Sequence, residues 1–501
     1  KKVQPNSKVW VVQYNSGKDG LLESVESTLK NSSVVLDNTF SHSESRASFD
    51  FQTENPVVFE VPSFVRNYKS NLKPQTELAS LKPVFSRLAE EDEPEETEIG
   101  DFHTFYFPYD SSADDFYDWD LGIVYQSEYA DIYYFNNISW LEDDNYGETF
   151  LSEKDFISIG NAFDEIYDAE TALMGGRNVM PLESYFISKT PCRVSIVLCD
   201  IYGDSTKNQS AGTFGYFDPA DLYFNAALEN EHSAETQVIY LDSVLYKNYK
   251  DTSISVIAHE FNHLLNFVNK EIKNDIPSEE TWFTEMLSAV AEDLLFDNCL
   301  DSLTSYANTV RNNRLPYFNG GYNMGITQTG SSFSQENYGF VLAYGSFLAR
   351  NYGGPSLINK IATNPYTDEK AITEALKSAG IKKDSKTYVT FEDTLIDFVT
   401  SVMNENIDVL NSSVKTLNRS VKGKVANTSF SADGINLSDF YQVVNGKKVK
   451  TKGLKTFSSK EKPDVGKYGF ILQYAGEGTE TLNVVIPEYD ELHMYCVIQN
   501  F

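Results

Sequence analysis

The chain has 501 residues, and its 41 lysines and arginines stand against 73 aspartates and glutamates, which gives a net charge of −32 at pH 7. A surface this acidic repels phosphate backbones and anionic lipid, so the composition disfavours nucleic-acid binding and binding to a membrane surface. Hydrophobic residues make up 41% of the sequence, as in a folded protein, and the length suggests two to four domains.

The four cysteines are too few to form a disulfide framework, and none has the CxxC spacing of a thiolate zinc site. No run of apolar residues reaches the length of about 18 that a membrane-spanning helix needs, so we expect no transmembrane segment. The sequence begins at Lys1 without an initiator methionine, so any leader peptide lies outside it.

The first hundred residues alternate short apolar runs with polar turns. Residues 7–14 and 56–61 have the composition of strands. Residues 88–98 form an acidic block that we expect to be a solvated linker. The sequence therefore predicts an N-terminal β-rich domain over residues 1–100 that ends in this linker.

The following region mixes strands with one long helix. Residues 156–175 show the apolar spacing of an amphipathic helix. Runs rich in branched and aromatic residues predict strands at residues 121–125, 132–135, 192–199 and 237–241.

Residues 255–267 form an apolar helical run that contains His259, Glu260 and His263, although the whole chain has only six histidines. Two residues four apart lie on one face of an α-helix, so both imidazoles can reach one zinc ion. Glu260 lies about 100° further round the helix, close enough to act on a metal-activated water without binding the metal. The alternative is a buried helix with two histidines in its core.

Residues 281–296 predict a second amphipathic helix, which a short polar connection joins to the first. Two helices joined in this way pack antiparallel, which makes Glu285 the natural third ligand. Glu292, seven residues further on, is placed to hydrogen-bond a ligating histidine. The alternatives are a glutamate favoured by the helix dipole for Glu285, and a solvated or salt-bridged residue for Glu292.

After this pair, the spacing predicts further helices at residues 342–350, 356–362, 369–378 and 392–404. From about residue 416, short β-type runs separated by turn residues indicate a small β-sandwich. We therefore predict a central domain over residues 101–415 and a C-terminal β-sandwich-like domain over residues 416–501.

Residues 258–267 and 281–293 resemble the hyicolysin family of bacterial metallopeptidases, in which a His-Glu-x-x-His helix precedes a second helix bearing tryptophan and glutamate. The similarity extends over about residues 120–400. It implies an α+β, zincin-like domain with an active-site helix and a helical second half, here flanked by β-rich domains at both ends. It also implies that His259, His263 and Glu285 bind Zn²⁺ and that Glu260 is the general base. Thr284 and Ala289 depart from the pattern of related enzymes, which carry asparagine and aspartate there.

The oxyanion of peptide hydrolysis needs a donor besides the metal, and Tyr338 and Tyr344 are both candidates for it. Extended substrate can add to a sheet edge near the active helix, either at residues 213–217 or at residues 238–241. The run that anchors a free amino terminus in zinc aminopeptidases is absent from the sequence, which favours an endopeptidase over an aminopeptidase.

These observations predict a zinc endopeptidase that acts on protein or peptide substrates. The resemblance places it outside the cytoplasm, either secreted or attached to the surface as a lipoprotein. The alternatives are a zinc exopeptidase, or a surface binding or adhesion protein with a weak or inactive peptidase domain. Neither substrate specificity nor oligomeric state follows from the sequence.

Overall fold

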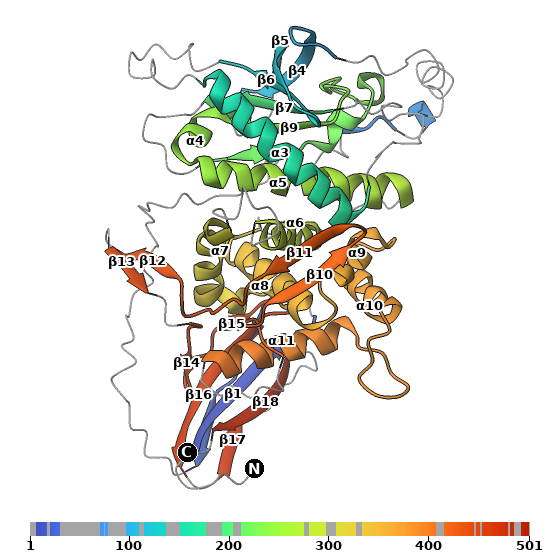
Figure 1. Cartoon of the computed structure of the whole chain (residues 1–501). Helices are drawn as coiled ribbons and strands as arrows, with labels where there is room; N and C mark the ends of the chain where they lie inside the picture. Colours follow the sequence, from blue (N-terminus) through green and yellow to red (C-terminus); the bar gives the residue numbers. More distant parts are fainter. Residues whose placement is uncertain are drawn as a thin grey trace.

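A group of helices lies between two β-sheets along the length of the molecule (Figure 1). The computed structural model describes residues 7–17, 21–30, 71–74, 76–78, 97–109, 115–136, 151–176, 193–203, 212–274, 280–296, 307–326, 333–406, 415–444, 447–450, 453–478, 481–484 and 492–499. Helix and strand are both abundant, so the α+β class predicted from the sequence is confirmed. None of the described helices is long and apolar enough to cross a membrane.

The first sheet has six strands in the order β4-β5-β6-β7-β9-β8. Strands β6, β7 and β9 run parallel, and the other neighbours pair antiparallel. All residues of β7 and β9 are buried, as expected for central strands rich in branched residues. These strands confirm the four predicted between residues 121 and 241. Their bounds are β4 Phe102–Pro108, β5 Phe116–Gln126, β6 Ala130–Tyr134, β7 Val194–Cys199, β8 Gly215–Tyr216 and β9 Val238–Asp242.

The two faces of this sheet have different partners. Alternate side chains such as Ile196 and Ile239 join the main core with the helices α3 (Glu153–Met174) and α5 (Lys250–Phe267). Their neighbours Val197 and Val238 join a separate aromatic cluster on the opposite face, because successive residues of a strand point to opposite faces. Helix α3 confirms the long helix predicted over residues 156–175. Helix α5 carries the two histidines directly under the sheet.

Helices α6 to α11 form the middle of the molecule, whereas α4 lies beside the first sheet (Figure 1). Helix α6 packs against α5 and α8, and α7 packs against α8. The predicted helices after residue 340 are confirmed, whereas α7, which contains Pro316, was not predicted. The bounds are α4 Ser243–Asn248, the π-helical turn η7 Val268–Ile272, α6 Thr281–Leu295, α7 Ala307–Gly321, η9 Tyr322–Met324, α8 Gln335–Asn351, α9 Pro355–Thr363, α10 Glu369–Ser378 and α11 Phe391–Asn406.

Buried ionic groups connect these helices. Asp293 of α6 accepts hydrogen bonds from Arg311 of α7 at 2.9 Å and from Arg350 of α8 at 2.5 Å. Ser346 of α8 donates to the same carboxylate at 3.0 Å. In η7, the buried ammonium of Lys270 donates to three backbone carbonyls around the end of α9, the nearest at 2.6 Å. These contacts hold the helices of the middle layer in fixed positions.

The second sheet has the strand order β14-β16-β1-β18. The N-terminal strand β1 pairs antiparallel with β16 on one side and with β18 on the other, and eight of its nine residues are buried. The two ends of the chain thus share one sheet. The strands are β1 Ser7–Asn15, β14 Phe457–Ser458, β16 Phe470–Gly478 and β18 Leu492–Gln499; short pairs are formed by β2 Leu22–Glu23 with β15 Asp464–Val465, β3 Ser27–Lys30 with β17 Thr481–Val484, β10 Val421–Val425 with β11 Thr428–Ala432, and β12 Tyr441–Val444 with β13 Lys447–Lys450.

Strand β1 confirms the strand predicted at residues 7–14, and β16 confirms one in the C-terminal region. The strand predicted at residues 56–61 and nearly all of the acidic block at 88–98 lie outside the described residues. The division into domains at residues 100 and 415 therefore stays a prediction, as does the C-terminal β-sandwich. The pairing of β1 adds that the first predicted domain contributes a strand to the last.

Three glycines let the second sheet approach the middle layer backbone to backbone. A Cβ atom on Gly466 would lie 2.0 Å from the carbonyl oxygen of Met324, and one on Gly469 would lie 2.4 Å from that of Asn323. Gly325, at φ +80, would likewise meet the carbonyl oxygen of Lys467 at 2.2 Å. Only glycine fits at such distances, so the backbone of η9 packs directly against the backbone of the turn before β16.

Candidate metal centre

His259 and His263 project from the same face of α5. Their ring centroids lie 4.8 Å apart, and the ring planes are inclined at 79°. The apolar residues around them bury the helix, and His259 itself is only 1% exposed. The four-residue spacing therefore brings two imidazoles together inside the protein, as the sequence predicted.

Helix α6 brings Glu285 to the same point. Its Oε2 lies 3.0 Å from Nε2 of His259, and its Oε1 lies 3.7 Å from Nε2 of His263. The three side chains offer ligand atoms that all lie within 4.8 Å of one another. Helices α5 and α6 thus pack as the short connection between them implied.

This donor set fits a tetrahedral zinc ion. Ligand atoms about 2.0–2.2 Å from such an ion lie roughly 3.3–3.5 Å apart, close to the two separations at Glu285. In addition, Nε2 of His263 is buried and has no hydrogen-bond partner among the described residues. A buried imidazole nitrogen without a partner is costly unless a metal or a proton donor satisfies it.

The other nitrogen of each ring is held by α6. Nδ1 of His259 lies 2.8 Å from Oε1 of Glu292, and Nδ1 of His263 lies 2.9 Å from the hydroxyl oxygen of Thr284. A proton on Nδ1 of each ring would leave the lone pair of Nε2 available to a metal ion. Glu292 therefore contacts a ring nitrogen of His259 as the sequence suggested, and its solvated alternative does not hold, because its side chain is fully buried.

Thr284 and Ala289 show how this chain departs from related sequences. The hydroxyl of Thr284 contacts His263, so a threonine supplies the polar contact at that position. Ala289 is fully buried and has no polar group to offer. The carboxylate on His259 comes instead from Glu292, one helical turn further along α6.

Arg314 of α7 belongs to the site, although the sequence did not indicate it. Its guanidinium lies 2.7 Å from Oε1 of Glu292 and 3.1 Å from Nδ1 of His259, and its side chain is 1% exposed. Because Arg314 neutralises Glu292, the site can hold this second buried carboxylate behind the histidine. The only sequence signal was an arginine inside an otherwise weakly patterned segment.

Glu170 of α3 also lies near Glu292, and the sequence did not indicate this. Burial, together with the nearby charge of Glu292, raises the pKa of the Glu170 carboxyl well above its usual range. This shift favours the neutral, protonated form of Glu170 beside the negative charge of Glu292.

Glu260 lies beside the three converging side chains and faces the edge of the first sheet. Its Oε2 accepts a hydrogen bond of 3.1 Å from the backbone N–H of Phe217, which directly follows β8. A Cβ atom on Gly215 would lie 2.7 Å from the carbonyl oxygen of Tyr240, so glycine allows β8 to lie close against β9. Burial, with a further contribution from the charge of Glu285, raises the pKa of Glu260 to about 8.

The protonation states of His259, His263 and Glu285 depend on one another. Burial opposes the charged form of His259, but hydrogen bonds to Glu285 and Glu292 outweigh it and raise the pKa of His259 to about 9. Burial lowers the pKa of His263 to about 4, so this ring is neutral at pH 7. Burial favours the neutral form of Glu285, but His263 and His259 outweigh it and lower the pKa of this carboxylate.

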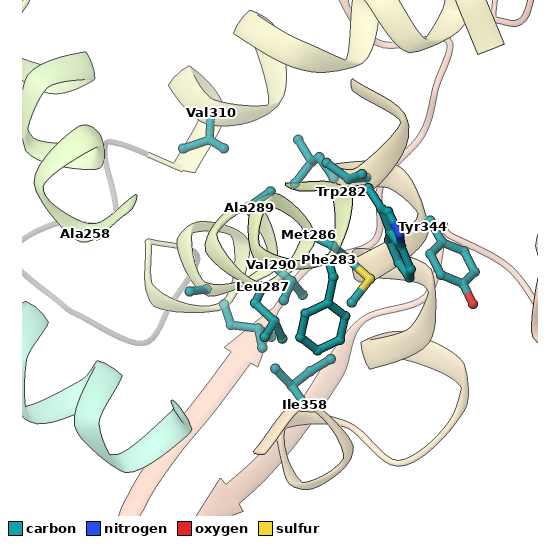
Figure 2. Packing of buried hydrophobic residues seen from close by; sticks show 14 of the residues in the cluster. Ala258, Trp282, Phe283, Met286, Leu287, Ala289, Val290, Val310, Tyr344 and Ile358 are labelled. Carbon is teal, nitrogen blue, oxygen red and sulfur yellow. The ribbon is translucent and has the colours of Figure 1, made fainter. Parts of the chain in front are cut away.

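Tyr338 and Tyr344, the two candidates for the oxyanion donor, have different surroundings in the structure. The hydroxyl of Tyr338 donates to Oε1 of Glu285 at 3.4 Å. The hydroxyl of Tyr344 instead lies 2.6 Å from that of Thr394, and Figure 2 shows Tyr344 among the hydrophobic residues around α6, beside Trp282. Tyr338 therefore lies at the candidate centre, and Tyr344 belongs to the core.

A family model described as peptidase M30 matches residues 137–413, which is more than half of the chain and includes every side chain of the site described above. No curated protein matches the sequence.

Proposed function

The chain belongs to peptidase family M30, the hyicolysin family of metallopeptidases, and from this premise we propose that it is a zinc-dependent endopeptidase. The observation that carries the proposal is the convergence of Nε2 of His259, Nε2 of His263 and the carboxylate of Glu285 within 4.8 Å. Two imidazoles and one carboxylate are the ligand set of catalytic zinc sites that keep one position open.

The residues around this point have separate tasks in the proposed reaction. When bound, zinc supplies a Lewis acid that polarises a peptide carbonyl and lowers the pKa of water toward about 7. Glu260 accepts the proton of the attacking water and passes it to the nitrogen of the leaving amine. Its buried position raises the pKa of the Glu260 carboxyl, so this carboxylate binds a proton more strongly than an exposed glutamate does.

Tyr338 is the proposed donor to the oxyanion. Its hydroxyl lies at the edge of the site, 3.4 Å from Glu285, and it is carried near the start of α8, which packs against α6. An O–H group aimed at the developing negative charge lowers the barrier to acyl transfer.

Strand β8 is the proposed docking edge for substrate. It is the last strand of the first sheet, whereas β9 lies between β7 and β8. An extended peptide can add to an open edge through backbone hydrogen bonds, so residues 213–217 suit this role and residues 238–241 do not. Such binding holds a peptide on both sides of the cleaved bond, as an endopeptidase requires. A location outside the cytoplasm rests on the family resemblance and stays part of this proposal.

We expect purified protein to hold about one zinc ion per chain and to cleave casein, and a chelator should abolish the cleavage until zinc is restored. His263→Ala should lose the zinc, because it removes one of three protein ligands. Elemental analysis of the dialysed proteins measures this. As a matched control, His493→Ala removes a histidine whose side chain lies at the surface beside Ser16, and it should keep the metal. Full zinc occupancy in His263→Ala would disprove the ligand assignment.

Glu292→Gln should weaken zinc binding about 10- to 100-fold while leaving some activity at saturating zinc. The amide keeps the shape of the side chain but no longer stabilises the proton on Nδ1 of His259, which makes that ring a poorer ligand. Competition with a chromophoric chelator measures the affinity. Glu153→Gln, an exposed change at the start of α3, is the control. Equal affinities for Glu292→Gln and the unchanged protein would show that Glu292 does not support the metal site.

A further inference from the structure

A cavity of about 870 Å³ lies where the end of α8, the start of α9, the end of α10 and helix α11 meet. Helix α8 has Tyr338 near its first turn and Asn351, which lines the cavity, at its last residue. These positions are about 20 Å apart along the helix axis. The cavity is therefore separate from the candidate metal centre.

The cavity has a balance of charge opposite to that of the whole chain. The protein carries a net charge of −32, whereas lysines outnumber acidic residues in the cavity lining. The charged lining residues are Lys360, Lys382, Lys383, Lys415, Asp393 and Asp397. A basic concavity on an acidic surface concentrates anions locally.

Two of the lysines are neutralised inside the cavity. Lys383 forms an ion pair of 3.0 Å with Asp393. Lys415 pairs with Asp397 and also donates to the hydroxyl of Tyr352 at 2.8 Å. These two pairs balance both aspartates of the lining.

The other two lysines have no carboxylate within ion-pair distance among the residues that the structure describes. Lys360 contacts the hydroxyl of Ser378 at 3.3 Å. Lys382 lies over the ring of Tyr388, with its ammonium 5.1 Å from the ring centroid. The lining therefore has two positive charges that no carboxylate among the described residues offsets.

The start of α9 adds to this positive character. The helix begins at Pro355 after Gly354, which has φ +68, and its first turn contributes Ser356 to the lining. Gly353, at φ +135, also lines the cavity. The N-terminus of a helix carries a partial positive charge, so it favours an anion in the cavity that the two lysines also line.

The remaining wall is apolar. Leu357 and Val389 are buried, and Ile381 and Ile396 are partly buried beside them. Both the size of the cavity and this apolar wall exceed what a bare inorganic anion needs, and they suit a ligand with a hydrocarbon part.

We propose that this cavity binds an organic carboxylate with an apolar body, whose acid group is held by the ammonium groups of Lys360 and Lys382 and whose apolar part lies against Leu357 and Val389. A carboxylate of this kind has two sources, a free organic acid or an acidic residue between apolar residues of a peptide. This site is additional to the proposed peptidase site and does not depend on it.

Isothermal titration calorimetry of the full chain tests the proposal with two pairs of probes. The first pair is acetyl-Leu-Glu-Leu-amide and its glutamine counterpart, and the second is hexanoate and hexanamide. At least one acid should bind about tenfold more tightly than its neutral counterpart, and this difference should shrink at high salt. Binding of hexanoate alone identifies a free acid, and binding of the peptide alone identifies a peptide segment. Inorganic phosphate should bind more weakly than the preferred acid.

The double variant Lys360→Met with Lys382→Met should bind that acid about tenfold more weakly at an unchanged thermal midpoint. The control is Lys154→Met with Lys250→Met, which removes the same charge. Lys154 is exposed on α3, and Lys250 lies over the ring of Tyr246 as Lys382 lies over that of Tyr388. Equal binding of acid and neutral probes, equal binding by the double variant and the unchanged protein, or no binding at millimolar concentration would each overturn the proposal.

Discussion

Glu260→Gln should lower kcat/KM for a peptide substrate by about 10²- to 10⁴-fold while the protein keeps its zinc. The amide fills the same buried space and can still accept the hydrogen bond from the N–H of Phe217. It cannot take the proton of the attacking water, so only the proton transfer is lost. Steady-state kinetics and elemental analysis on the same preparation measure both quantities.

A second Glu→Gln substitution, far from the candidate metal centre, serves as the control. Glu374→Gln alters a glutamate of α10 that forms an exposed pair with Lys377, and it should leave both zinc and kcat/KM unchanged. Loss of zinc from Glu260→Gln would mean that Glu260 binds the metal or holds the fold. Full activity of Glu260→Gln would place the general base elsewhere.

Asp293→Ala should reduce the free energy of unfolding by about 3–5 kcal/mol, the largest stability effect that we expect from a single change in the chain. The substitution leaves Arg311 and Arg350 buried without their shared carboxylate. Urea denaturation at pH 7, followed by tryptophan fluorescence, measures the loss. Asp439→Ala breaks an exposed pair with Lys450 and should change stability by less than about 1 kcal/mol. A loss of similar size in both variants would contradict the role of the buried cluster.

The pKa of Asp293 predicts that its contribution to the stability of the protein depends on pH. Burial alone would raise the pKa of Asp293, but Arg350 and Arg311 outweigh it and hold the pKa well below its usual range. A carboxylate with a lowered folded-state pKa contributes stability that is complete above its unfolded pKa of about 3.9 and is lost as the pH falls below that value. The gap in stability between the unchanged protein and Asp293→Ala should therefore narrow below about pH 4.

The core of the site could be predicted because it depends on local geometry. The spacing of His259, Glu260 and His263 within one helix determines how they project, and the short connection limits where Glu285 can lie. The sequence could not choose between Tyr338 and Tyr344, because both lie on α8 and only tertiary packing decides which hydroxyl reaches Glu285. Arg314 was missed because α7 contains Pro316, which weakens a helical pattern.

The order of strands in the sheets could not be predicted from the sequence, also because it depends on tertiary structure. A strand pattern shows that residues 7–14 are extended and half apolar, but it carries no information about which strands pair with them. The partners of β1 come from the far end of the chain, with Trp10 opposite Tyr474 on one side and Val497 on the other. Strand β16 lies among the C-terminal β-type runs that the sequence predicted, but its pairing with β1 was not predicted, and β18 was not singled out.

This pairing has a consequence for biosynthesis. Residues 7–15 leave the ribosome early, whereas both neighbours of β1 are made only after residue 470. At about 5–20 residues per second, the first strand waits roughly 20–90 s for them. During that time an apolar strand with open hydrogen-bonding edges is exposed to other chains. Nascent chains stalled before residue 470 should therefore depend on a chaperone that covers residues 7–15, and synthesis of residues 470–499 should release it.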